Sequence, residues 1–176
     1  MTDLSETARP SQLWKQLSAE RRLTAADAFW RDVNAVAEQV QVVSLIAQRI
    51  KFRPKSVVAM PIEKKARQLV AVPVLPELIA ARLLVSYHLL HQRPMMGRFL
   101  DALGVKHEEG VIADDEIEKP AADRLRDAVN ALTGEFQPGD VSLYFTTLLW
   151  QDPDTWGGLA DLMPAGASDS SPSQPA

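Results

Sequence analysis

Residues 73–104, PVLPELIAARLLVSYHLLHQRPMMGRFLDALG, decide the predicted fold. Pro76 suits the first position of a helix, because the N–H group that proline lacks has no helical partner there. The residues after it are apolar in nearly every direction around a helix, which is typical of a helix buried on most sides. Pro94 begins a second helix, and Gly104 is placed to end it in the left-handed conformation. The stretch therefore predicts a central buried hairpin over about 76–103.

The rest of the chain predicts many short helices joined by tight turns. Eight of the twelve prolines stand at or just before an expected helix start, namely Pro10, Pro54, Pro61, Pro76, Pro94, Pro120, Pro138 and Pro153. No segment shows the clear alternation of apolar and polar residues that is typical of a half-buried strand. The predicted fold class is all-α, a compact multi-helix domain of short helices and helical hairpins around the central hairpin.

Two parts of this fold are predicted in residue detail. Apolar residues that recur at spacings of three and four predict an amphipathic helix, and we expect it to end near Lys51. These residues are Val36, Val40, Val43, Ala47 and Ile50. On the central hairpin, four leucines are expected among the most buried side chains: Leu83, Leu84, Leu89 and Leu90.

Length and composition predict one soluble domain. A chain of 176 residues is long enough for a single core. We place that domain at residues 10–163, between a flexible N-terminus (1–9) and a disordered Ser/Pro/Ala tail (164–176). The absence of cysteine excludes disulfides, thiolate metal sites and cysteine nucleophiles. Neither a signal-peptide pattern nor a membrane-length apolar run is found, so we expect no membrane association and a cytoplasmic location.

The charge is unevenly distributed along the chain. Residues 1–106 hold 16 basic and 9 acidic side chains, whereas residues 107–176 hold 3 basic and 14 acidic ones. This asymmetry fits either a separate partner for each half or mutual attraction of the two halves. Residues 107–118 predict a long acidic loop with a brief extended piece at Val111 and Ile112, and we expect this loop to fold back over the basic turn around Arg53 and Lys55.

The three histidines of the chain are candidate metal ligands. His88 and His91 are three residues apart and therefore share a helix face, and His107 follows the hairpin beside Glu108 and Glu109. Imidazoles at this spacing, completed by a third histidine or a carboxylate, suit zinc. The alternative is that His88 and His91 are half-buried histidines that hydrogen-bond within the fold. We predict no cofactor beyond this candidate metal.

A run of basic residues is the candidate partner-binding region. It comprises Arg49, Lys51, Arg53, Lys55, Lys64, Lys65 and Arg67, and only Glu63 interrupts it. Such a run can bind phosphates or an acidic partner, but it can equally complement the negative end of a helix dipole. Binding of nucleic acid is disfavoured, because we find no recognisable helix-turn-helix pattern and no aromatic-interleaved platform.

These observations favour a non-catalytic protein-interaction or regulatory module over an enzyme. Motifs for a nucleophile or a phosphate-binding loop are missing. The expected partner is a protein that binds the basic region or a groove between hairpins. The alternative is a metal-binding protein or enzyme that uses His88, His91, His107 and nearby carboxylates. The two hypotheses can be distinguished by whether the three histidines lie close enough together to bind one metal ion.

Overall fold

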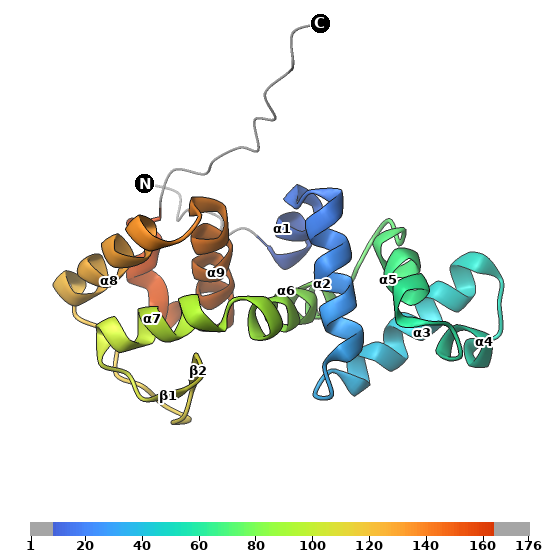
Figure 1. Ribbon diagram of the computed structural model, residues 1–176, viewed down its shortest axis with the longest axis horizontal. Helices are drawn as coiled ribbons and strands as arrows, with labels where there is room; N and C mark the ends of the chain where they lie inside the picture. Colours follow the sequence, from blue (N-terminus) through green and yellow to red (C-terminus); the bar gives the residue numbers. More distant parts are fainter. Residues whose placement is uncertain (1–8, 164–176) are drawn as a thin grey trace, which may run out of the picture. The chain divides into compact units, whose positions relative to one another are not determined.

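The computed structural model describes residues 9–163 and is all-α, as predicted. This part of the chain forms ten α-helices, one short 3-10 helix and a sheet of two strands of two residues each (Figure 1). The predicted tail, 164–176, and all of the predicted flexible N-terminus except Arg9 lie outside the described residues. Among the described helices, none combines the length and the apolar character needed to cross a bilayer.

The chain divides into two compact units, where the sequence predicts one domain. We call residues 8–92 the N-terminal unit and residues 93–163 the C-terminal unit. The boundary falls inside the predicted central hairpin, so that its two helices belong to different units. Each of these helices has its packing partners in its own unit, which is why the pair does not act as one shared core.

The N-terminal unit contains six helices. They are α1 (Pro10–Gln16), α2 (Ala19–Arg31), α3 (Val36–Ile50), α4 (Pro54–Val58), α5 (Ile62–Val70) and α6 (Glu77–His91). Helix α2 packs against both α5 and α6, α1 packs against α6, and α3 packs against α4. The core of the unit includes Phe29, Ile46, Leu69 and Ile79, which are completely buried.

The predicted burial of α6 is correct in its middle and wrong at its end. Leu83 and Leu84 are buried, whereas Leu89 is half-buried and Leu90 is 50% exposed. Leu78, at the start of the helix, is also exposed. The helix is apolar on nearly all sides, but the helices packed against it cover only part of its surface.

Glu77 links the start of α6 to the start of α1. Its carboxylate accepts a hydrogen bond from the backbone N–H of Ser11 at 3.0 Å and another from the Ser11 hydroxyl at 2.5 Å. The first N–H groups of a helix have no partner within that helix, so Glu77 caps α1 from a distant part of the chain. The hydrogen bond from the Ser11 side chain is the main cause that lowers the pKa of Glu77 below its ordinary value.

Replacing Glu77 by glutamine should therefore destabilise the protein in a pH-dependent way. A carboxyl whose pKa is lower in the folded state stabilises that state above its unfolded pKa, and the contribution is lost as the pH falls through the folded pKa. We expect Glu77→Gln to reduce the free energy of unfolding by about 1–2 kcal/mol at pH 7. Denaturant unfolding at pH 7 and pH 3 checks this, since the difference in stability between the two proteins should be smaller at pH 3. An equal difference at both pH values would contradict the role of the carboxylate.

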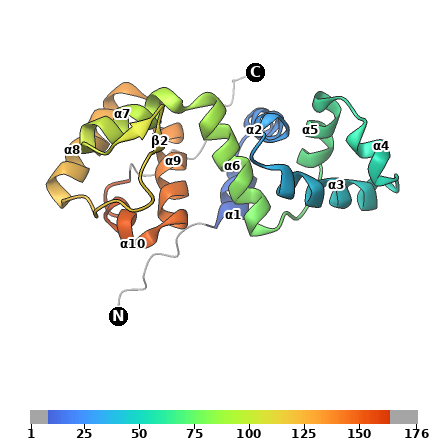
Figure 2. The same cartoon turned by 90° about the horizontal axis from the view of Figure 1, so that it is seen from below.

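The C-terminal unit packs around an aromatic core. Its elements are α7 (Arg93–Leu103), β1 (His107–Glu108), β2 (Val111–Ile112), α8 (Ala122–Glu135), α9 (Pro138–Gln151), α10 (Pro153–Trp156) and the 3-10 helix η1 (Gly157–Leu159). Figures 1 and 2 show α7 beside α8. The ring of Phe99 on α7 lies 4.9 Å from that of Phe145 and 5.8 Å from those of Tyr144 and Trp156, measured between centroids.

The first half of the predicted acidic loop is a β-hairpin that packs on α7. His107 pairs with Ile112 and Glu108 with Val111, which leaves a two-residue turn. The turn residues Glu109 and Gly110 both have positive φ, 48° and 86°, as a type I′ turn requires. Val111 and Ile112 are therefore extended, as predicted, and the sequence prediction lacked only the second strand, His107–Glu108, with which they pair.

Candidate interaction surface

The predicted basic residues lie on α3, α4 and α5 of the N-terminal unit and in the turn between α3 and α4. Helix α3 stops because Lys51 takes the left-handed conformation, with φ of 56°, and the N–H of Phe52 donates to the carbonyl of Ala47 at 3.0 Å. This arrangement satisfies a carbonyl at the helix end. Arg53 is extended, and Pro54 then begins α4. We call residues 51–55 the basic turn.

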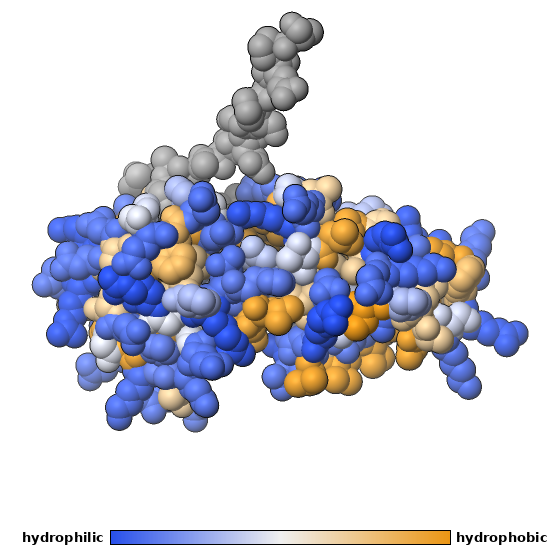
Figure 3. All heavy atoms as spheres, in the orientation of Figure 1, coloured by the Kyte–Doolittle hydropathy of each residue, from blue (hydrophilic) through white to orange (hydrophobic). Residues whose placement is uncertain are grey.

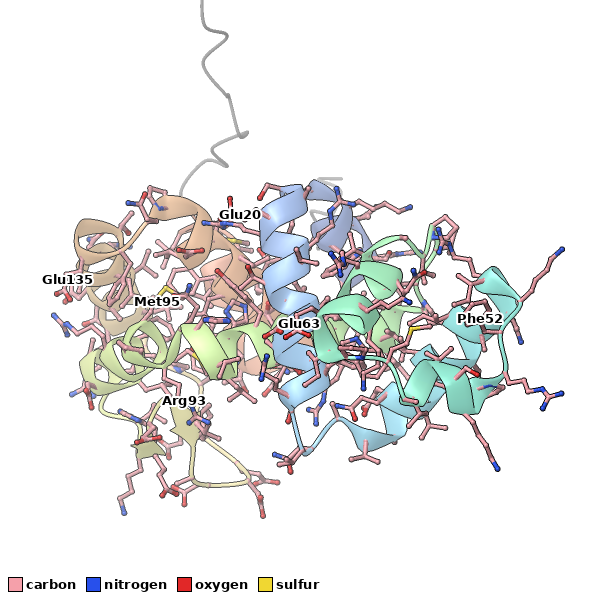
Figure 4. The ribbon with its side chains drawn as sticks, turned by 45° about the vertical axis from the view of Figure 1, so that its right-hand side comes forward. Glu20, Phe52, Glu63, Arg93, Met95 and Glu135 are labelled. Carbon is pink, nitrogen blue, oxygen red and sulfur yellow. The ribbon has the colours of Figure 1, made fainter. Side chains whose placement is uncertain are left out.

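The basic turn combines cations with an exposed aromatic ring. All five residues of the turn are exposed, and Phe52 is 52% exposed between Lys51 and Arg53. The short helix α4 is anchored by the buried side chain of Val57, while Val58 is 60% exposed. Figure 4 shows Phe52 at the surface of this part of the chain. Apolar side chains that stay exposed among charges are typical of a surface used in binding.

Helix α5 adds further cations. Ala66 and Leu69 are buried, whereas Lys64 and Arg67 point to solvent. Helices α3 and α5 are linked by a hydrogen bond of 3.1 Å from the Arg49 guanidinium to the side-chain oxygen of Gln68.

Lys65 belongs to a different environment from the other six basic residues. Its ammonium group lies 4.7 Å from the ring centroid of Trp30, a cation–π contact, and its side chain is half-buried. Lys65 therefore serves the packing of α5 on α2.

Within the N-terminal unit, the cations of the basic turn have no ion-pair partner among the described residues. Within the described residues, Lys51, Arg53 and Lys55 have no carboxylate within ion-pair distance, and the same is true of Lys64. By contrast, Arg31 on α2 is held by Asp27 through two hydrogen bonds of 2.8 and 3.2 Å. A new ion pair at the basic turn would therefore not have to displace an existing one.

An open groove runs between α2 and α5 of the same unit. It has a volume of about 320 Å³ and is lined by Leu23, Thr24, Asp27, Glu63, Ala66 and Arg67. Figure 4 shows Glu63 beside α2. The apolar part of the lining comes from Leu23 and Ala66. The groove lies between two helices that are distant in sequence.

The structure does not bring the three candidate metal ligands together. His88 and His91 belong to the N-terminal unit and His107 to the C-terminal unit. His88 is buried, and this burial lowers its pKa to about 3, whereas His91 is exposed. Residues 9–163 contain no group of three or more side chains that could hold a metal ion.

His107 instead fastens the β-hairpin to α7. Its Nδ1 accepts a hydrogen bond from the backbone N–H of Gly110 at 3.0 Å, and its Nε2 lies 2.9 Å from a carboxylate oxygen of Asp101 on α7. This pattern fits the neutral ring with its proton on Nε2, donated to Asp101. Both ring nitrogens of His107 are therefore engaged within the fold.

Sequence reasoning did not single out Phe52, Val58 or the α2–α5 groove. A signal for Phe52 was present, since it is the only aromatic residue between Trp30 and Tyr87 and stands within the basic run. For Val58 and the groove we find no such signal, because the exposure of one valine and the spacing of two helices depend on tertiary packing.

Comparisons of the chain with protein-family models, with curated proteins and with solved structures found no match.

Proposed function

We propose that the N-terminal unit is a non-catalytic protein-binding module whose basic turn binds an acidic segment of a partner protein. The observation that carries the proposal is the combination of three unpaired cations and one exposed aromatic ring within five consecutive residues, 51–55. The cations attract carboxylates, and the ring supplies apolar area to bury. The unit as a whole has 13 basic and 6 acidic side chains, net +7, which favours an acidic partner at long range.

The two kinds of contact should contribute differently. Exposed ion pairs contribute only about 0–1 kcal/mol each, so the charges mainly speed association and select the partner. Burying the exposed half of an aromatic side chain contributes about 1–2 kcal/mol. We therefore expect the partner to carry an apolar residue among its carboxylates, with Phe52 and Val58 as its contacts.

A protein partner is favoured over nucleic acid by the apolar contacts. Phosphate binding needs cations but no exposed valine, and Val58 lies just beyond the basic turn. Glu63 also interrupts the cations of α5 and would repel a polyanion without any apolar contact to compensate. Nucleic acid is nevertheless included as a competing probe in the test.

Reversing the charge of the basic turn should abolish binding. Peptides are selected from a random display library against the full chain, and the affinities of the enriched peptides are measured by fluorescence anisotropy. The selected peptides should be rich in Asp and Glu. A variant carrying Lys51→Glu, Arg53→Glu and Lys55→Glu should bind them at least about tenfold more weakly, which corresponds to about 1.4 kcal/mol. Phe52→Ala should weaken binding without unfolding the chain, and rising salt should weaken binding to the wild type.

The matched control makes the same change in charge elsewhere. Lys106, Lys119 and Arg126 are exposed cations of the C-terminal unit that have no carboxylate within ion-pair distance in the described chain. Changing all three to Glu should leave the affinity within about twofold, because only long-range attraction is altered. Equal weakening by both triple variants, or tighter binding of a duplex DNA probe than of any peptide, would contradict the proposal.

A further inference from the structure

Helix α3 has an exposed stripe without any charge. Along the helix, the exposed residues other than Arg49 in its last turn are Val36, Ala37, Val40, Gln41, Ser44 and Gln48. They recur at spacings of three and four and therefore form one continuous face. Val33, in the corner before the helix, extends the face at its N-terminal end and is 82% exposed. We call residues 33, 36, 37, 40, 41 and 44 the α3 stripe.

The α3 stripe is unusual for this unit. Solvent-exposed helix faces normally carry charged side chains, as α5 does with Glu63, Lys64 and Arg67. On the stripe, Val36 is 58% exposed and Val40 is 62% exposed, although the sequence pattern grouped them with the buried Val43. Figure 3 shows hydrophobic surface gathered over the α2–α3 corner and the first turns of α3.

The corner that presents Val33 is held in place by hydrogen bonds. The side chain of Asp32 accepts from the Ser86 hydroxyl at 2.8 Å and from the backbone N–H of Asn34 at 2.9 Å. The amide of Gln39 donates to the carbonyls of Phe29 and Asp32 at 2.8 and 3.0 Å. A fixed corner loses little conformational freedom when a partner covers it, so burying the exposed valines there costs little conformational entropy.

We propose that the α3 stripe binds the α3 stripe of a second copy of this chain, with the two helices antiparallel about a two-fold axis. In such an interface each surface meets itself, so any net charge on it would face an equal charge and repel. A charge-free stripe in a unit of net charge +7 removes this repulsion at the one place where two copies touch. The short side chains of Ala37, Val40 and Ser44 also allow the helices to approach closely. A charged partner, by contrast, would find no charged side chain on the α3 stripe with which to form an ion pair.

The size of the stripe predicts a weak dimer. A standard interface buries roughly 800 Å² on each partner, and a stripe from one helix and one corner offers less. In the antiparallel arrangement Val40 lies near the two-fold axis and meets its own copy, while Val36 of one chain approaches Ser44 of the other. The association should therefore be rapid and reversible, and measurements must extend to about 1 mM protein.

Sedimentation equilibrium of the full chain tests the dimer. The wild type should shift from monomer to dimer as its concentration rises, and Val36→Glu with Val40→Glu should remain monomeric because it places carboxylates against carboxylates. The matched control changes Val74 and Leu90, two exposed apolar residues outside the stripe, to Glu. It adds the same charge and should still dimerise. A monomeric wild type at 1 mM, or a dimer that persists in the stripe variant, would overturn the proposal.

Crosslinking locates the contact. The natural chain has no cysteine, so a single introduced cysteine reports one position. Val40→Cys should form a disulfide-linked dimer under mild oxidation, whereas Val74→Cys should not. Equal crosslinking of both variants would also overturn the proposal. Added salt should not weaken this apolar association, in contrast to binding at the basic turn, so the two surfaces are tested independently.

Discussion

Replacing Phe99 by alanine should lower the free energy of unfolding of the C-terminal unit by about 3–5 kcal/mol. Phe99 is completely buried, and its ring contacts those of Tyr144, Phe145 and Trp156. Removal of the ring leaves a cavity that these large, rigid neighbours cannot fill, and it also removes aromatic contacts between α7, α9 and α10. Denaturant unfolding monitored by tryptophan fluorescence measures the change, since Trp150 and Trp156 lie in this unit.

The same substitution at Phe52 is the control. Phe52 is 52% exposed, so Phe52→Ala removes an equal number of atoms from a site that is largely in contact with water already. It should change the free energy of unfolding by less than about 1 kcal/mol. Similar losses for Phe99→Ala and Phe52→Ala would show that Phe99 does not hold the core of the C-terminal unit.

Replacing Gly110 by alanine should destabilise the β-hairpin by about 2–4 kcal/mol. The φ of 86° is unfavourable for a residue with a Cβ atom. An added Cβ would also lie 2.7 Å from the Cβ of Met96 and 3.0 Å from the carbonyl oxygen of Arg93, both on α7. To relieve this overlap the hairpin must move away from α7, which would break the contact between His107 of the hairpin and Asp101 of α7. Hydrogen exchange at residues 107–112 and denaturant unfolding measure the two effects.

Gly134→Ala is the matched control. Gly134 lies in the last turn of α8, and an added Cβ there would meet nothing within 4 Å. Alanine is about 1 kcal/mol more favourable than glycine inside a helix, so this variant should be as stable as the wild type or slightly more stable. If both glycine variants behave alike, Gly110 does not hold the hairpin against α7.

The sequence was sufficient for the fold class but not for the division into units. Proline placement and the spacing of apolar residues depend on local geometry, and they predict the ten-helix architecture of residues 9–163 well. Tertiary packing, however, decides which apolar face of a helix is covered by another helix. Val40 and Val43 belong to the same sequence pattern, yet only Val43 is buried, and Leu90 is exposed while Leu83 is not. For the same reason the sequence could not indicate that the two helices of the central hairpin would join different cores.

Prediction of the candidate site had a similar limit. Six of the seven basic residues are exposed as expected, because charge itself keeps side chains in water. Lys65 differs, since its contact with Trp30 joins residues 35 positions apart in sequence. The histidine hypothesis depended on spacing alone, and spacing does not reveal that His88 is buried or that His107 is already engaged by Asp101 and Gly110.

The two units also bear on how the protein behaves in solution. In the described part of the chain, the C-terminal unit has 6 basic and 14 acidic side chains, net −8, against +7 for the N-terminal unit. The isoelectric point of about 5.4 is thus a cancellation between two highly charged bodies, since most carboxylates are still ionised at that pH. Near pH 5.4 unlike units of neighbouring molecules attract, so the solubility minimum there should be deep and should be relieved by moderate salt. Both anion- and cation-exchange resins should retain the protein on either side of this pH. Each resin binds the unit of opposite charge, so the salt needed for elution will reflect the charge of that unit and not the net charge of the protein.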